Sequence, residues 1–175
     1  MTKEEILQSA KQVFNEFSHD CIQLQDAVFF EKKEGKWSVA ENVQHLILST
    51  RMTNLAYRLP VFIVRLMAGK SNRPSKTFEE LQNKYLRKLE EGAKASSPFV
   101  PKPLSISGSK EKLMDKWKNI SAGFCKAVER NRTEKDLDNY LVKHPLLGKI
   151  TLRELCYFTI FHTRHHLETL HKLSV

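Results

Sequence analysis

The stretch FHTRHHLETLHKL, residues 161–173, combines four histidines with the apolar spacing of a helix. On a helix that advances about 100° per residue, Leu155, His162, His166 and Leu170 fall within one narrow sector. We therefore expect His162 and His166 to face the interior of a helical protein. Three other residues of this stretch are expected to point away from the interior: Arg164, His165 and His171.

The helical period extends upstream through most of the chain. Apolar residues recur every three or four positions from Ile6 to Val28, and again from Leu113 to Val128. The second helix should run from Ser38 to about Leu59, where Pro60 kinks or ends it, although VFIVRLMAG could continue it to Gly69. Four capping boxes, each with a glutamate three residues further on, predict helix starts at Thr2, Ser38, Thr77 and Thr151.

Four long amphipathic helices and almost no strand alternation predict an all-α four-helix bundle that forms one domain over residues 1–175. Residues 131–150 are expected to form a loop with turns at Pro145 and Gly148. The short first connection predicts that helices one and two are antiparallel neighbours. Residues 69–108 are expected to form a long crossover carrying a short helix, which permits helices two and three to be parallel neighbours.

Composition narrows the class of protein. The net charge is +9, but acids accompany most of the lysines and no basic run contains aromatic residues, so we expect no nucleic-acid partner. No apolar run reaches the roughly 20 residues that span a bilayer, and the N-terminus lacks a signal-like apolar region. We therefore expect a cytoplasmic protein without a membrane partner. The cysteines lie on apolar stripes without metal-site spacing, which indicates buried, reduced thiols: Cys21, Cys125 and Cys156.

His162 and His166 stand one helical turn apart, so both imidazoles can reach a single cation. The alternative is a pair of core histidines that hydrogen-bond to their neighbours. His45 is the best third ligand, because it follows Ser38 by seven residues while His166 precedes Leu173 by seven. If these two helices pack antiparallel, His45 and His166 meet at the same level. Taken alone, His45 would be interpreted as a satisfied core histidine.

Other residues are candidates for roles around such a site. Asn42 and Ser49 lie one turn on either side of His45 and could supply hydrogen bonds to the ligand side chains. His144 precedes the last helix and is either a turn residue or a residue at the pocket mouth. His19 lies opposite the apolar stripe of the first helix and should be solvated. Three neutral imidazoles leave a coordination position open on a Lewis-acidic metal.

The motif W-S-x-x-E-x-x-x-H-L at residues 37–46, followed by H-T-R-x-H-L at 162–167, resembles the DinB/YfiT-like superfamily. The resemblance covers nearly the whole chain in element order. It implies a bundle with a three-histidine site for a divalent metal, often zinc or nickel, with His45, His162 and His166 at the ligand positions. It also implies frequent dimerisation, so a homodimer is expected. Relatives often carry Gln shortly after the last ligand, where this chain reads Leu-Glu-Thr.

Activities known among proteins of that superfamily are S-transfer with low-molecular-weight thiols, thiol-dependent isomerisation and metal-dependent hydrolysis. The first hypothesis is therefore a metal-dependent enzyme acting on a small molecule, either a thiol S-transferase or a hydrolase. The second is a metal- or ligand-binding stress protein without catalysis. A basic nucleic-acid-binding bundle is the weakest of the three hypotheses. It predicts salt-dependent DNA binding that survives loss of the histidines.

Overall fold

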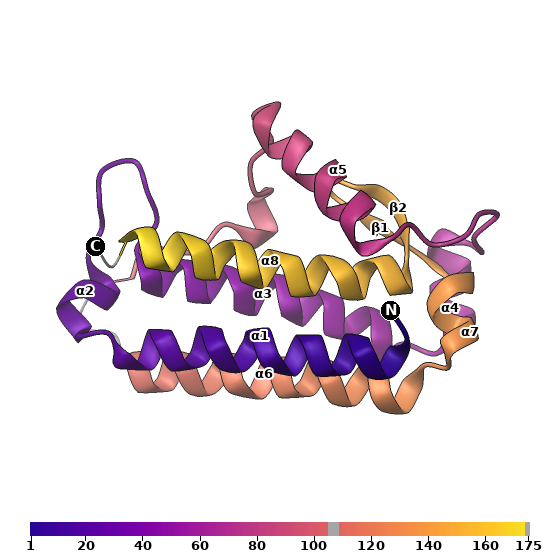
Figure 1. Cartoon of the computed structure of the whole chain (residues 1–175), viewed down its shortest axis with the longest axis horizontal. Coiled ribbons are helices and arrows are strands. Elements are labelled where there is room, and N and C mark those ends of the chain that lie inside the picture. Colours follow the sequence, from indigo (N-terminus) through magenta and orange to yellow (C-terminus); the bar gives the residue numbers. More distant parts are fainter. Residues whose placement is uncertain (105–108, 174–175) are drawn as a thin grey trace.

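The computed structural model describes residues 1–104 and 109–173, so the predicted crossover at 69–108 is described except for its last four residues. In the described part, four long helices form a bundle (Figure 1): α1 (Lys3–Gln23), α3 (Val39–Arg58), α6 (Lys110–Asn131) and α8 (Leu152–Leu173). Shorter elements join them: α2 (Asp26–Phe30), α4 (Val61–Ala68), α5 (Phe78–Glu90), the 3₁₀ turn η1 (Ser97–Phe99), α7 (Glu134–Asn139), β1 (Leu141–His144) and β2 (Gly148–Thr151). The predicted helical bundle is confirmed, with a small β-hairpin added.

The predicted helix starts are confirmed at all four capping boxes. Thr2, Ser38 and Thr77 each accept a hydrogen bond from the backbone N–H of the glutamate three residues later, and that glutamate accepts one in return. Thr151 and Glu154 make the same reciprocal pair at the start of α8. These contacts lie within four consecutive residues, so the local sequence is sufficient to specify them.

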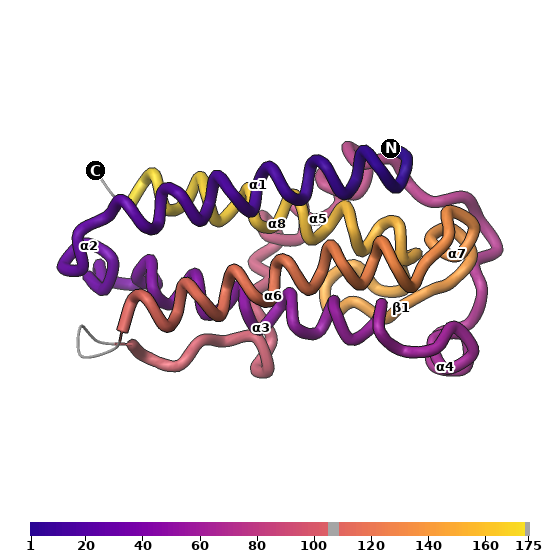
Figure 2. Tube along the Cα trace, turned by 90° about the horizontal axis from the view of Figure 1, so that it is seen from below, coloured from indigo at the N-terminus to yellow at the C-terminus, as the bar shows by residue number. Residues whose placement is uncertain are grey.

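The packing order of the long helices differs in one respect from the prediction. α3 packs against α6 and α8, and α1 packs against the same two helices. Helices α1 and α3 are antiparallel, as expected, but they lie diagonally across the bundle rather than side by side (Figures 1 and 2). The long crossover places α3 and α6 next to each other in parallel. The core enclosed by the four long helices contains the fully buried rings of Phe17, Trp117 and Phe124.

The first predicted helix ends earlier than its apolar stripe, and the second ends where Pro60 was expected to end it. The first ends at Gln23, and a separate short helix, α2, turns Phe29 and Phe30 into the core. The second ends at Arg58, because the residue before a proline is driven to extended backbone and Leu59 has a ψ of 140°. The VFIVRLMA segment is therefore a separate helix, α4, and does not continue α3.

The predicted loop at residues 131–150 contains regular structure. Thr133 and Asp136 cap α7, and β1 pairs with β2 in an antiparallel hairpin. Pro145 begins the hairpin loop, and Gly148 has a φ of 74°, which a glycine adopts without strain. Lys84 of α5 donates a hydrogen bond to the carbonyl of Leu147, so the hairpin is tied to the crossover helix. None of the described helices is long and apolar enough to cross a membrane.

Candidate metal centre

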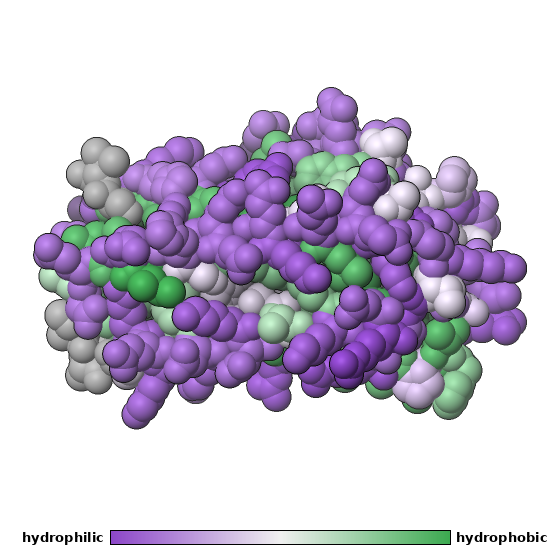
Figure 3. All heavy atoms as spheres, turned by 60° about the horizontal axis from the view of Figure 1, so that its bottom comes forward, coloured by the Kyte–Doolittle hydropathy of each residue, from purple (hydrophilic) through white to green (hydrophobic). Residues whose placement is uncertain are grey.

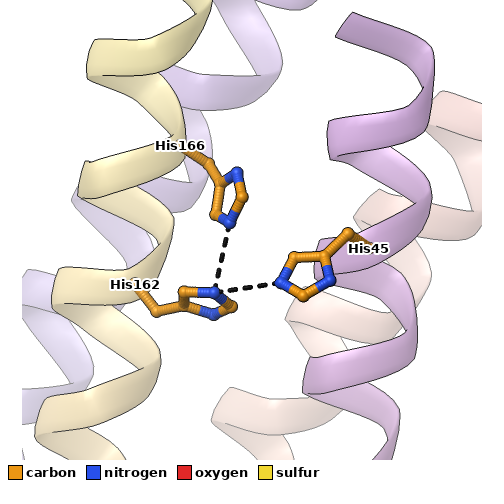
Figure 4. A group of neighbouring side chains, drawn as sticks. All are labelled: His45, His162 and His166. Atoms are coloured by element: carbon orange, nitrogen blue, oxygen red, sulfur yellow. Dashed lines mark hydrogen bonds between the residues drawn. The ribbon is translucent and has the colours of Figure 1, made fainter. Parts of the chain in front are cut away.

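Three histidines from two antiparallel helices converge in the bundle (Figure 4). His162 and His166 lie one turn apart on α8, and His45 faces them from α3. The Nε2 atom of His162 lies 3.1 Å from Nε2 of His45 and 3.1 Å from Nε2 of His166. All three side chains are buried. The structure thus brings together the three residues that the sequence singled out.

The Nδ1 hydrogen bonds decide which nitrogen of each ring carries the proton. His45 Nδ1 lies 2.7 Å from the carbonyl oxygen of Phe99, and His166 Nδ1 lies 2.7 Å from Oδ1 of Asn42. Carbonyl oxygens only accept hydrogen bonds, so both rings donate at Nδ1. Their Nε2 atoms consequently present lone pairs, and both lone pairs are directed toward the ring of His162. Outer-sphere carbonyl partners orient metal-binding imidazoles in this way.

The amide of Asn42 is held in one orientation by the start of α3. Its Nδ2 donates to the carbonyl oxygens of Trp37 at 3.3 Å and Ser38 at 2.8 Å, which leaves Oδ1 to accept from His166. Asn42 therefore makes a hydrogen bond to a ligand side chain, as expected, and the ligand that it orients is His166. Ser49 does not orient His45 through any hydrogen bond of the described residues; it lies on the wall of the adjoining pocket.

Electrostatics keep the cluster uncharged. Burial lowers the pKa of His45, and burial together with repulsion from the neighbouring imidazoles holds the pKa of His162 and His166 well below the usual histidine range. Neutral imidazoles are the form that binds metal ions.

A divalent cation fits this donor set better than hydrogen bonding alone. Nε2 of His162 can donate one proton at most, so one of the two neighbouring lone pairs, each 3.1 Å away, would be left without a donor. In a tetrahedral site with metal–nitrogen bonds of about 2.05 Å, neighbouring ligand nitrogens are about 3.3 Å apart. The two short separations are close to that value, and all three ligand atoms lie within 4.8 Å of one another.

A pocket of about 360 Å³ opens directly onto the three imidazoles. Its walls come from α3, α5, α8, the crossover and the hairpin. They are mainly apolar and aromatic, with side chains that include Trp37, Met52, Leu89, Phe99, Leu155 and Phe158. Tyr85 adds a phenol whose pKa is raised to about 12 by burial, so this hydroxyl stays protonated at neutral pH. The pocket has the size and apolar lining of a small-molecule site.

Both roles considered for His144 are realised. Its Nδ1 accepts hydrogen bonds from the backbone N–H groups of Leu146 and Leu147, each at 3.2 Å, so it shapes the hairpin turn. The ring also lines the pocket and lies 4.2 Å from the ring of Phe158, centroid to centroid. Burial lowers its pKa to about 4.

The assignment of His165 requires a correction. It was expected to point away from the core, but it is half-buried and lines the pocket. The pocket extends past the core-facing sector of α8 because the crossover and hairpin cover that side of the helix. His19, Arg164 and His171 are exposed as expected, and His171 lies 2.7 Å from the carboxylate of Asp20.

Three groups that shape the site were not identified from the sequence. The carbonyl of Phe99 belongs to the backbone, and no pattern of side chains predicts such a hydrogen-bond acceptor. Tyr85 lies on α5, which the sequence predicted without placing it over the histidines. The ring of Phe158 stacks on the ring of His162, with 4.8 Å between the ring centroids. Phe158 stands one helical turn before His162, so the sequence could have predicted this contact.

The sequence of the chain matches the DinB superfamily over residues 4–170. The chain belongs to the DinB superfamily. Searches of curated proteins and of solved structures found no match. Membership in the DinB superfamily agrees with the helical bundle and with the buried three-histidine cluster at its core.

Proposed function

We propose that this DinB-superfamily protein is a metal-dependent enzyme acting on a small apolar molecule, as a thiol S-transferase or a hydrolase. One observation carries the proposal: two imidazoles fixed as Nδ1–H tautomers aim their Nε2 lone pairs at a third, at the floor of an apolar pocket. His45, His162 and His166 would hold the ion, with zinc or nickel as the expected metals. Such an ion supplies a Lewis-acid centre with an open coordination position.

The chain's own residues would bind and orient the substrate. The aromatic walls formed by Trp37, Phe99 and Phe158 exclude water and would contact an apolar substrate. The protonated hydroxyl of Tyr85 can donate a hydrogen bond to a substrate oxygen. No cysteine is among the described residues that line the pocket, so a thiol nucleophile would come from a separate low-molecular-weight thiol.

A second function, a metal- or ligand-binding protein without catalysis, is favoured by one feature. Among the described residues lining the pocket there is no carboxylate that could act as a general base. A pocket without a carboxylate is adequate for binding and leaves its acid–base chemistry to His144 and His165.

The first experiment measures bound metal by elemental analysis after expression without nickel resin or chelators. We expect about one equivalent in the wild type, loss of the metal in His162→Ala/His166→Ala, and no change in His19→Ala, whose ring is exposed. Circular dichroism verifies that each variant is folded. Retention of the metal in the folded double variant would falsify the assignment of the ligands.

The second experiment separates the two functions. The metal-loaded protein is assayed for cleavage of p-nitrophenyl esters and for transfer of small thiols to 1-chloro-2,4-dinitrobenzene. Turnover that disappears in the double variant supports the enzyme and identifies its class. Full metal occupancy without either activity, over a range of esters, thiols and electrophiles, favours the binding protein.

A further inference from the structure

Helix α4 turns an apolar face to solvent. The side chains of Phe62, Leu66 and Met67 are 70%, 86% and 63% exposed, whereas Val64 and Ala68 on the opposite face are buried. Phe62 and Leu66 stand four residues apart, so they are neighbours on the outer face. Figure 3 shows hydrophobic surface at the end of the molecule that carries α4. Scattered exposed apolar residues are ordinary, but a contiguous group on one short helix indicates a contact surface.

The charges around this face have one sign. No acidic residue occurs between Glu41 and Glu79, a segment that contains six basic residues. Three of them are exposed and lie on or next to α4: Arg58, Arg65 and Lys70. Arg65 immediately precedes Leu66 and is three residues from Phe62, so its guanidinium borders the apolar group.

The neighbouring elements do not neutralise this charge. α4 packs against β1, whose exposed side chain, Lys143, is also basic. The carboxylates of the nearby α7 are engaged elsewhere. Glu134 and Asp138 pair with Arg153, and Asp136 caps its own helix at Thr133.

We propose that the outer face of α4 docks this protein on the surface of an anionic lipid bilayer. Phe62, Leu66 and Met67 would enter the boundary between headgroups and acyl chains, and the flanking basic side chains would contact the lipid phosphates. This combination of apolar and basic residues is typical of interfacial helices. The net charge of +9 adds long-range attraction to a negative surface.

A second copy of the chain is a less favourable occupant. A symmetric dimer pairs the same patch on both subunits, so contact through α4 would bring the basic residues of both copies together. The proposal also departs from the sequence-based expectation of no membrane partner. That expectation rested on the length of chain needed to span a bilayer, which an eight-residue interfacial helix does not need.

The test is co-sedimentation of the full chain with vesicles of phosphatidylcholine alone or mixed with phosphatidylglycerol. We expect binding only to the mixed vesicles, and weaker binding at high salt. Both Phe62→Ser/Leu66→Ser and Arg65→Glu should weaken binding by about tenfold or more. The matched controls are Ile22→Ser, at another exposed apolar position, and Lys116→Glu, at another exposed cation; both should bind as the wild type does.

Three results would overturn the proposal. The first is absence of wild-type binding to the mixed vesicles. The second is an equal loss of binding in the α4 variants and their controls, with all proteins folded by circular dichroism. The third is a wild-type dimer, seen by light scattering, that Phe62→Ser/Leu66→Ser converts to monomers, because the patch would then belong to a second copy.

Discussion

Oδ1 of Asn42 on α3 lies 2.7 Å from Nδ1 of His166 on α8, and this contact joins the capped start of one helix to the candidate metal site on another. The amide group of Asn42 is itself held by the carbonyls of Trp37 and Ser38. The tautomer of His166 thus depends on how α3 begins, more than 120 positions earlier in the chain.

Asn42→Ala removes this acceptor and should weaken metal affinity by about 10–100-fold, as loss of such outer-sphere partners usually does. Competition with a chromophoric chelator measures the affinity. Ser49→Ala is the matched control, because its hydroxyl lines the pocket without holding a ligand ring, and its affinity should stay near that of the wild type. Equal weakening in both variants would contradict the role assigned to Asn42.

His144→Asn should flatten the acid dependence of stability. The pKa of His144 is about 4 in the folded protein and about 6.5 normally, so as pH falls the unfolded chain takes up the proton first. The neutral ring of His144 therefore contributes fully to the stability of the fold above pH 6.5, and this contribution is lost as the pH falls toward 4. Asparagine keeps a hydrogen-bond acceptor for the turn without titrating. The slope of the unfolding free energy against pH should therefore decrease by up to about 1.4 kcal/mol per pH unit.

Urea denaturation of the wild type and His144→Asn across this range, both with a chelator, measures the difference. All other residues are the same in the two proteins, so the difference between the profiles reports on position 144. Parallel pH profiles for the two proteins would show that His144 is not buried as a neutral ring.

Glu154→Ala should destabilise the fold by about 2–4 kcal/mol. Its buried carboxylate accepts hydrogen bonds from both Nη atoms of Arg73, at 2.6 and 2.9 Å, and from the backbone N–H groups of Lys76 and Thr151. Its loss leaves these donors unpaired and frees the crossover from α8. Denaturant unfolding gives the free energy, and limited proteolysis should show new cleavage near Arg73. Glu90→Ala, at an exposed position, is the control and should be nearly neutral.

Tyr57→Phe should cost about 1–2 kcal/mol of unfolding free energy. The hydroxyl of Tyr57 is fully buried, donates to the carbonyl oxygen of Leu152 at 2.7 Å and lies 3.0 Å from Sγ of Cys156. Phenylalanine keeps the ring and removes this link between α3 and α8. Calorimetry of the variant beside Tyr140→Phe, which changes a half-buried tyrosine, measures the effect. Equal melting temperatures for Tyr57→Phe and the wild type would be inconsistent with this prediction.

The three thiols should be unreactive in the native protein. Burial raises the pKa of Cys125 to about 11 and of Cys156 to about 12, and it raises the pKa of Cys21 further. Thiolates are the reactive form, so Ellman's reagent should detect none rapidly in the native state and all three in guanidinium. A thiol that reacts fast in the native state would show local opening near that cysteine.

Much of the architecture could be predicted because its causes are local. The capping boxes at Thr2, Ser38, Thr77 and Thr151 involve four-residue contacts, and the structure contains each of them. The predictions failed where tertiary packing competes with a periodic pattern. The apolar stripe continued to Val28, but α1 ends at Gln23 so that the two phenylalanines of α2 can pack inside.

The sequence by itself determined the helices, the inward direction of His162 and His166, and the choice of His45 as their partner, because a helical period assigns each residue to a face. The tertiary structure decided the rest. It placed α1 and α3 on a diagonal, folded the crossover so that the carbonyl of Phe99 holds His45, and brought His144 and His165 to one pocket. These relationships join residues far apart in the chain through backbone atoms and through packing, and neither leaves a periodic signal in the sequence.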